Sequence, residues 1–143
     1  MSEVRPALTG VNLFVTDMQA TVEFYRRLGL TIDDSHDWGA HHVQVVMPNG
    51  LELEFDSIEL TRSYDAGWQG PDATKGVMVF SVATREAVDE LYEELTAAGY
   101  VGHQEPFDAF WGARYGVVED PDGNNVGLMS PSDDAFKGAP PSL

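Results

Sequence analysis

The chain repeats its own pattern, and this repeat limits the fold more than any other feature of the sequence. Residues 10–17 alternate like a strand, and residues 18–28 follow with apolar side chains at helical spacing. Val77 takes the place of Gly10 after 67 residues, and a strand-like run and a helical run follow it in the same order. A fixed period of this kind indicates two copies of one supersecondary unit.

Both predicted helices have matching start and stop signals. Asp17 and Thr84 stand immediately before the helical runs, where a side-chain oxygen can accept a hydrogen bond from a free backbone N–H. Gly29 and Gly99 stand at the ends, where glycine commonly terminates a helix. The apolar stripes are Met18, Val22, Tyr25 and Leu28 in the first copy, and Val88, Leu91, Tyr92 and Leu95 in the second.

Each copy also ends in a predicted hairpin. Asn49-Gly50 and Asp122-Gly123 each follow a proline and lie between strand-like runs, and such dipeptides are strong hairpin signals. A short strand-like segment after each helix completes a β-α-β-β-β order. The predicted strands are residues 10–17, 30–32, 43–47 and 51–55 in the first copy, and 77–82, 100–101, 115–119 and 124–129 in the second.

We therefore predict one α+β domain of two tandem βαβββ modules that form a cupped mixed sheet. The first module spans residues 8–56 and the second spans residues 76–130. Residues 57–75, rich in Ser, Asp, Gly and Pro, connect the modules. Residues 131–143 are predicted to be a loose tail.

The composition excludes several classes of function. Lys and Arg number 8 against 24 Asp and Glu, so the net charge of −16 would repel nucleic acid and an anionic membrane. The chain has no cysteine, which excludes disulfides, thiolate metal sites and a cysteine nucleophile. No apolar run approaches the ~18 residues of a spanning helix, and no signal peptide is visible, so we expect a cytoplasmic protein.

Strand alternation predicts which side chains face away from each helix. In the first module these are Asn12, His42 and the carboxylates Glu52, Glu54 and Asp56. In the second module the equivalent face is more apolar and consists of Val77, Val79, Ser81, Tyr115, Val117, Asn125, Gly127 and Met129. If the two faces curl toward each other they form a cleft with one acidic and one apolar wall. A solvated sheet face is the alternative interpretation.

Several large aromatic side chains fall in predicted loops or at loop ends, where ligand contacts concentrate. They are Trp38, Trp68, Phe107, Phe110 and Trp111. Indole is a good surface for stacking and for cation–π contact, although any single tryptophan is more often a hydrophobic plug or a dimer contact. Three tryptophans in loops favour a stacking site, to which Tyr115 would also contribute.

Three phrases of the sequence resemble the vicinal oxygen chelate superfamily, which includes glyoxalases, bleomycin-resistance proteins and dioxygenases. They are V-x-x-F-V-x-D-M at 11–18, F-Y-x-x-L-G-L at 24–30 and E-D-P-D-G-N at 119–124. The resemblance implies the paired βαβββ fold over residues 8–130. It implies little about chemistry, because the superfamily includes isomerases, dioxygenases, thiol transferases and non-catalytic drug binders.

Metal enzymes of this superfamily resemble one another in four ligand positions. Carried over to this chain, these positions are Gly10 and Val77 for histidine, and Glu54 and Gly127 for glutamate. Only Glu54 can coordinate an ion, whereas a divalent metal usually needs at least three protein ligands. We expect no metal and no cofactor.

Two uses of His42 remain open. A relocated metal site could combine His42 with Glu52 and Glu54, although His41 would point to the opposite face of the strand and could not join it. Alternatively, His42 or Glu54 could act as a metal-free general base, but the sequence arranges no nucleophile or second acid beside them.

A second resemblance, to mitomycin-resistance proteins, rests on residues 57–71, 98–103 and 111–115. It implies a homodimer without metal that stacks an antibiotic between aromatic rings in a cleft at the subunit interface. Arg114 lies within the last of these segments and could contact an acidic ligand group, but we expect it to pair with Glu119 or Asp120.

We therefore predict a metal-free protein that sequesters a small planar compound, cationic or weakly basic, of the mitomycin or bleomycin kind. No catalytic residue is assigned. The predicted ligand-binding residues are Asn12, Trp38, His42, Glu52, Glu54, Trp68, Phe107, Trp111 and Tyr115. One alternative is a metal-dependent glyoxalase-like lyase or isomerase, or a ring-cleaving dioxygenase; another is an interaction or sensor domain whose cleft has decayed.

Overall fold

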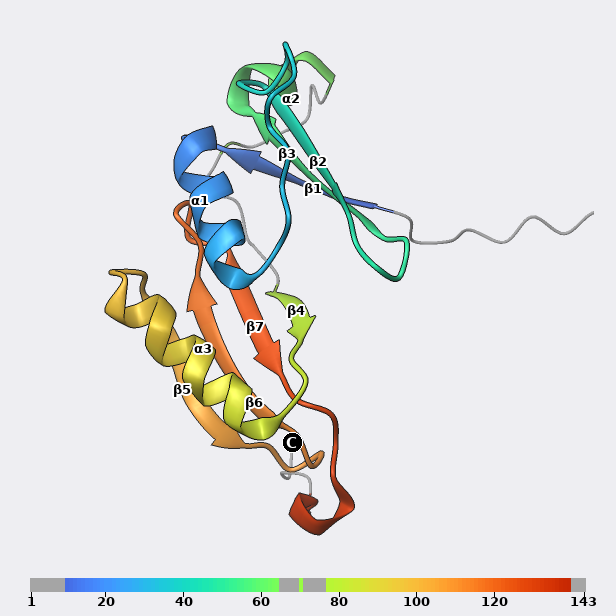
Figure 1. Ribbon diagram of the computed structural model, residues 1–143, viewed down its shortest axis with the longest axis vertical. Coiled ribbons are helices and arrows are strands. Elements are labelled where there is room, and N and C mark those ends of the chain that lie inside the picture. The colour runs from blue at the N-terminus through green and yellow to red at the C-terminus, as the bar shows by residue number, and fades with distance from the viewer. Residues whose placement is uncertain (1–9, 65–69, 71–76, 140–143) are drawn as a thin grey trace, which may run out of the picture. The chain divides into compact units, whose positions relative to one another are not determined.

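A computed structural model describes residues 10–64, 70 and 77–139 of the chain. The chain divides into two compact units, Met1–Asp72 and Ala73–Leu143, and each unit has its own sheet (Figure 1). The division falls inside the predicted connection at 57–75. The α+β fold class predicted from the sequence is confirmed, with one mixed sheet in each unit.

The first unit contains a three-stranded sheet and two helices. Its elements in chain order are β1 (Gly10–Val15), α1 (Met18–Leu28), β2 (His42–Val46), β3 (Glu52–Ser57) and α2 (Ile58–Tyr64). The strand order is β1-β3-β2, with β1 parallel and β2 antiparallel to β3. The first strand of the module therefore lies beside its last strand.

Helix α1 begins and ends where the sequence predicts. The Asp17 carboxylate accepts a hydrogen bond from Ala20 N at 3.1 Å. Gly29 has a φ of 120°, a backbone conformation that residues other than glycine rarely adopt. The helix buries Val22, Tyr25 and Leu28 of its apolar stripe, and the Tyr25 ring lies 4.8 Å from the Phe55 ring of β3. Burial of each such side chain stabilises the unit by roughly 1.5–3 kcal/mol.

The second unit contains a four-stranded sheet covered by one long helix. Its elements are β4 (Val77–Ser81), α3 (Arg85–Ala97), β5 (Gly102–Asp108), β6 (Arg114–Glu119), β7 (Asn125–Met129) and the 3₁₀ turn η1 (Asp134–Phe136). The order is β4-β7-β6-β5, and β4 is parallel to β7. Helix α3 packs on β5, β6 and β7 (Figure 1). The parallel pair β4–β7 matches β1–β3, as expected of two copies of one unit.

Two predicted strands are wrong. Residues 30–32 form no strand, because Ile32 is buried and its carbonyl accepts a hydrogen bond from Arg26 Nη2 at 2.7 Å instead of a strand partner. The strand predicted at 100–101 lies instead at 102–108. It is an edge strand that contains Pro106 and shifts register twice against β6, so it lacks the alternation by which strands are recognised.

The described parts of the predicted connection and tail contain regular structure. Ser57 ends β3 and helix α2 follows it, and the predicted loose tail makes specific hydrogen bonds as far as Gly138. Asp133 N donates to Gly112 O at 3.0 Å, and Gly138 N donates to Phe110 O at 2.9 Å. The tail therefore supports the loop between β5 and β6, while residues 140–143 lie outside the described part.

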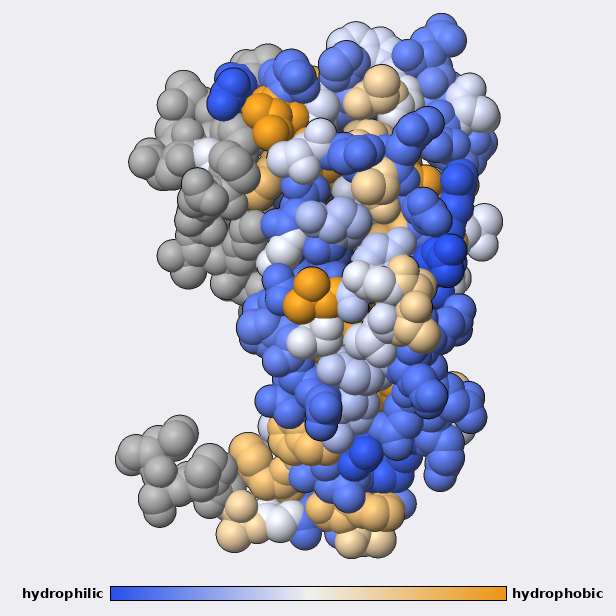
Figure 2. Space-filling view, turned by 90° about the vertical axis from the view of Figure 1, so that its left-hand side faces the viewer, coloured by the Kyte–Doolittle hydropathy of each residue, from blue (hydrophilic) through white to orange (hydrophobic). Residues whose placement is uncertain are grey.

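Acidic side chains coat the exposed side of α3. They are Glu86, Asp89, Glu90, Glu93 and Glu94. The face shown in Figure 2 is coloured mainly hydrophilic, with smaller hydrophobic areas among it. Within the described ranges, no helix is both long enough and apolar enough to cross a membrane.

The turn between β6 and β7 depends on a buried carboxylate. Asp120 accepts hydrogen bonds from Asp122 N at 3.0 Å and from Asn124 N and Nδ2, both at 2.9 Å. We predict that Asp120→Ala lowers the free energy of unfolding by about 2 kcal/mol, because it leaves these donors without that acceptor. Urea unfolding measures the loss. The exposed Asp134→Ala is the control and should change stability by less than about 0.5 kcal/mol; equal effects would contradict this assignment.

Candidate functional site

Four aromatic side chains meet at one end of β5 and β6, and we call them the aromatic cluster. Phe107 and Tyr115 are cross-strand partners whose ring centroids lie 6.2 Å apart. Trp111 lies 5.7 Å from Tyr115 and 5.2 Å from Phe110. All three contacts are edge-to-face, which the quadrupoles of aromatic rings favour. Phe107 and Phe110 are exposed, so this cluster presents aromatic surface to solvent.

The Tyr115 ring lies across Gly127 of β7. A Cβ atom placed on Gly127 would be 2.9 Å from Tyr115 Oη and 3.0 Å from Cε1, which is too close for any side chain. Gly127 therefore provides the space that the ring occupies. Burial raises the pKa of the Tyr115 phenol, so the hydroxyl remains protonated and uncharged.

The loop that carries Phe110 and Trp111 is held by hydrogen bonds at both ends. Ala109 N donates to Ala113 O at 2.9 Å, and Gly112 has a φ of 96°. The Gly112 carbonyl accepts hydrogen bonds from Arg85 Nη1 at 2.7 Å and from Asp133 N at 3.0 Å. The position of Trp111 is thus fixed by α3 on one side and by the C-terminal segment on the other.

The arginines near this loop form ion pairs with carboxylates of the same unit. Arg114 Nε donates to Asp89 Oδ1 at 2.9 Å, and Arg114 Nη1 lies 3.3 Å from Asp108 Oδ1. Our prediction that Arg114 pairs with Glu119 or Asp120 is therefore wrong, because the side chain reaches across to α3. The hydrogen bond to Asp89 raises the pKa of Arg114, and the hydrogen bond from Arg85 lowers the pKa of Asp108.

A second group of functional side chains lies on the first sheet, and we call it the polar cluster. It consists of Asn12, His42, Glu54 and Asp56, which share one face because β1, β2 and β3 align them in register. His42 Nδ1 lies 2.7 Å from Asp56 Oδ1, and Asn12 Nδ2 donates to Asp56 Oδ2 at 3.0 Å. His42 Nε2 lies 3.5 Å from Glu54 Oε1.

The register confirms that Glu52, Glu54 and Asp56 point to one face, but they do not form a uniform acidic wall. Asp56 is only 1% exposed, and its two oxygens already accept hydrogen bonds from His42 and Asn12. The Asp56 carboxylate therefore binds His42 and Asn12 rather than a ligand. Alternation reveals the direction of a side chain but not the partners that cover it.

The remaining predicted site residues lie apart from these clusters or outside the described residues. Trp38 is 61% exposed in the loop before β2, where its ring centroid lies 6.0 Å from that of His41. Glu52 is on the face of the polar cluster, opposite Gly10 and Val46. Trp68 lies outside the described residues. Sequence reasoning missed Asp56 as the partner of His42, although its spacing from Glu54 placed it on the same face.

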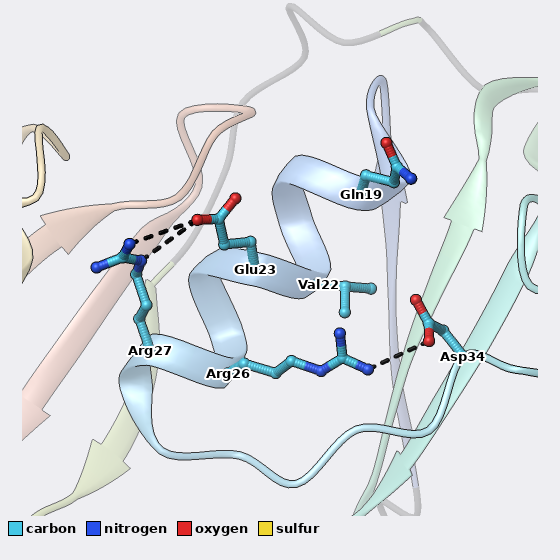
Figure 3. Close-up of a pocket in the computed structure, with 6 residues that line it drawn as sticks. All are labelled: Gln19, Val22, Glu23, Arg26, Arg27 and Asp34. Atoms are coloured by element: carbon cyan, nitrogen blue, oxygen red, sulfur yellow. Dashed lines mark hydrogen bonds and ion pairs between the residues drawn. The ribbon is translucent and has the colours of Figure 1, made fainter.

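A depression of about 570 Å³ lies against helix α1 (Figure 3). Its size would suit a small ligand, but its charged side chains are already paired. Arg26 is paired with Asp34 at 3.2 Å and Arg27 with Glu23 at 3.5 Å, and the two guanidinium groups point apart. No group here converges on a common point, so we do not assign a function to this depression.

Comparison with known proteins identifies the family. The profile of the Glyoxalase/Bleomycin resistance protein/Dioxygenase superfamily matches residues 7–128, which include both parallel strand pairs and the aromatic cluster. The chain belongs to this superfamily. A comparison with curated proteins finds no match.

Solved structures of the superfamily share the fold. A family enzyme from Burkholderia phytofirmans PsJN has a TM-score of 0.75 and 23% identity, with 87% of this chain and 98% of that chain covered. A member from Nocardioides has a TM-score of 0.71 and 24% identity over 99% and 92%. Lactoylglutathione lyase from Agrobacterium tumefaciens has a TM-score of 0.66 and 19% identity over 90% and 96%. At these identities, the likeness establishes the fold alone.

The residues at the superfamily's metal positions do not fit a metal ion. A Cβ on Gly10 would lie 3.8 Å from Glu54 Oε2, so the position is adjacent to Glu54 but carries no donor. Val77 offers only an isopropyl group, and the space at Gly127 holds the Tyr115 ring. Among the residues that the structure describes, no three His, Asp or Glu side chains are arranged to hold an ion.

The ion pair between Arg85 and Asp108 can be tested by titration. We predict that Arg85→Gln moves the Asp108 pKa upward toward its ordinary value of 3.8, because the main hydrogen bond to its charged form is lost. Because the pKa of Asp108 is lower in the folded protein than in the unfolded chain, the ionised carboxylate stabilises the fold above pH 3.8. This contribution to the free energy of unfolding is lost as the pH falls through the lowered pKa of Asp108 in the folded protein. Carboxyl ¹³C NMR follows the titration. Lys137→Gln, which removes the partner of Asp134, is the control, and an unchanged Asp108 titration in Arg85→Gln would contradict the pairing.

Proposed function

We propose that this protein binds a small planar compound without a metal ion, by stacking it on the aromatic cluster. One observation carries the proposal. At the position where metal enzymes of the superfamily have a glutamate, this chain has Gly127, and the Tyr115 ring occupies the space of that side chain. The exchange replaces a charged ligand with an aromatic surface on the same face of the sheet.

The apolar exposure of the second sheet supports this proposal. Phe107 and Phe110 are 40% and 43% exposed, and Val77 and Val79 are 47% and 48% exposed. Strand register places the two valines on the same face as Tyr115. Apolar surface gains roughly 25 cal/mol for each Å² removed from water, so a planar ligand that covers these side chains would be held mainly by their burial.

The charge of the chain favours a cationic or weakly basic ligand. A net charge of −16 raises the local concentration of cations. Three of the described basic side chains lie near the aromatic cluster, and each is paired with a carboxylate: Arg85 with Asp108, Arg114 with Asp89, and Lys137 with Asp134. They are therefore not free to attract an anion. A ring that carries positive charge would also gain cation–π energy from Trp111.

The biological role that we propose is sequestration of an antibiotic of the mitomycin or bleomycin kind by a homodimer. Both features come from the resemblance to mitomycin-resistance proteins. Capture is stoichiometric, so protection would depend on protein abundance and on the residence time of the ligand. The metal-dependent lyase, isomerase or dioxygenase receives no support from the donor set at Gly10, Val77 and Gly127.

Ligand binding can be tested by thermal shift and by tryptophan fluorescence. We predict that tag-free protein is stabilised by at least one planar cationic aromatic compound, by about 2.7 kcal/mol at a free concentration of 100 times Kd. The same compound should quench Trp111. The double variant Trp38→Phe/Trp68→Phe isolates this signal, because Trp111 is then the only tryptophan in the chain.

The matched substitutions are Trp111→Ala and Trp38→Ala. Trp111→Ala should abolish the thermal shift while the protein remains folded, whereas Trp38→Ala, which changes an exposed side chain of the other unit, should retain it. No thermal shift with any cationic aromatic compound would reject sequestration. A shift that survives Trp111→Ala would place the ligand elsewhere.

A further inference from the structure

The polar cluster of the first sheet contains a histidine paired with a buried carboxylate, and binding by the aromatic cluster makes no use of this pair. His42 Nδ1 lies 2.7 Å from Asp56 Oδ1. We propose that His42 is a general base that accepts a proton at Nε2 from a bound carbon or oxygen acid. This inference goes beyond the proposed binding and does not depend on it, because it concerns different residues in the other unit.

The Asp56 contact fixes which nitrogen of the ring can accept the proton. Asp56 Oδ1 accepts a hydrogen bond, so the neutral imidazole holds its proton on Nδ1 and presents a lone pair at Nε2. Asp56 is itself held, since Asn12 Nδ2 donates to its other oxygen at 3.0 Å. A carboxylate that is 1% exposed and bound on both oxygens cannot easily turn away from the ring.

The His42 ring is partly accessible to a ligand. The His42 side chain is 34% exposed, and Glu54 Oε1 lies 3.5 Å from Nε2, beyond good hydrogen-bond distance. When Nε2 takes a proton, the imidazolium has Asp56 on one side and Glu54 on the other. Among the described residues, the charged side chains that the strands place on this face are Glu52, Glu54 and Asp56, and Asn12 is the β1 side chain of the cluster. Helix α2, which packs on β1 and β3, carries Glu59 and Arg62. The two carboxylates in contact with the ring favour the protonated product.

The chemistry specifies a class of substrate. The site offers a base but no described nucleophile beside it, so it suits removal of a proton from a carbon activated by a neighbouring electron-withdrawing group, or from an acidic hydroxyl. Asp56 acts through the His42 ring and is therefore a positioning residue. The step needs no metal, oxidant or second reactant.

The probe 5-nitrobenzisoxazole tests this step alone. A base removes the proton at C3, the C–H electron pair forms the nitrile, and the N–O bond breaks to give 2-cyano-4-nitrophenolate, which is coloured. The proton remains on Nε2 and then passes to water. We expect His42→Gln to lower the rate constant by about 100-fold, the lower end of what a positioned general base contributes. His41→Gln is the matched control, because its Nδ1 pairs with the Ser57 hydroxyl and not with a carboxylate.

Two further variants separate positioning from packing. Asp56→Asn and Glu54→Gln each remove one negative charge that stabilises the protonated ring, so both should lower kcat while KM changes little. A purely structural role for these carboxylates would lower the amount of folded protein and leave kcat per folded molecule unchanged. Near-UV circular dichroism checks that each variant is folded.

A measurement on the unaltered chain keeps the proposal falsifiable if a variant does not fold. Two-dimensional ¹⁵N NMR of the imidazoles should show the neutral His42 ring protonated on Nδ1 and unprotonated on Nε2. The reverse tautomer would overturn the proposal. So would a His42→Gln rate equal to that of the unaltered chain, or equal losses in His41→Gln and His42→Gln. Because Trp111 fluorescence reports the ligand site separately, failure here would leave the proposed binding intact.

Discussion

One face of each sheet is buried by the helix of its own module, and this constraint decides which side chains remain for function. The parallel pairs β1–β3 and β4–β7 align the first and last strands, so that alternate residues of both strands share a face. The faces under the helices hold the buried cores, exemplified by Tyr25 with Phe55 and by Val88 with Val118. Whatever the protein binds must therefore be recognised by the opposite faces, by the loops or by the helix surfaces.

The two opposite faces have diverged although the modules share one plan. On the first sheet the face is polar, and Asp56 joins His42 to Asn12 at its centre. On the second sheet the equivalent face is apolar, and the missing side chain of Gly127 leaves space for the Tyr115 ring, which makes edge-to-face contacts with Trp111 and Phe107. A duplicated unit has thus acquired two different chemistries, proton transfer and stacking in our proposals.

The fold could be predicted because its signals are local and repeated. Helix caps such as Asp17 and hairpin turns such as Asp122-Gly123 appear in the sequence as they do in the structure. The site could be predicted only in part. Alternation gave the direction of His42 and Tyr115, but the burial of Asp56 and the reach of Arg114 to Asp89 depend on tertiary contacts that no local pattern encodes. Strand β5 was misplaced for a related reason, since an edge strand with Pro106 has little need of alternating side chains.

The central claim is that the aromatic cluster binds its ligand without a metal. The most direct test is a two-dimensional NMR titration of chelator-treated, tag-free protein with a planar cationic compound that binds it. We predict that the signals that shift first belong to Phe107, Phe110, Trp111 and Tyr115, and that chelation does not weaken binding. Shifts centred on Gly10 and Glu54, or binding that returns only when a divalent metal is added, would contradict the account.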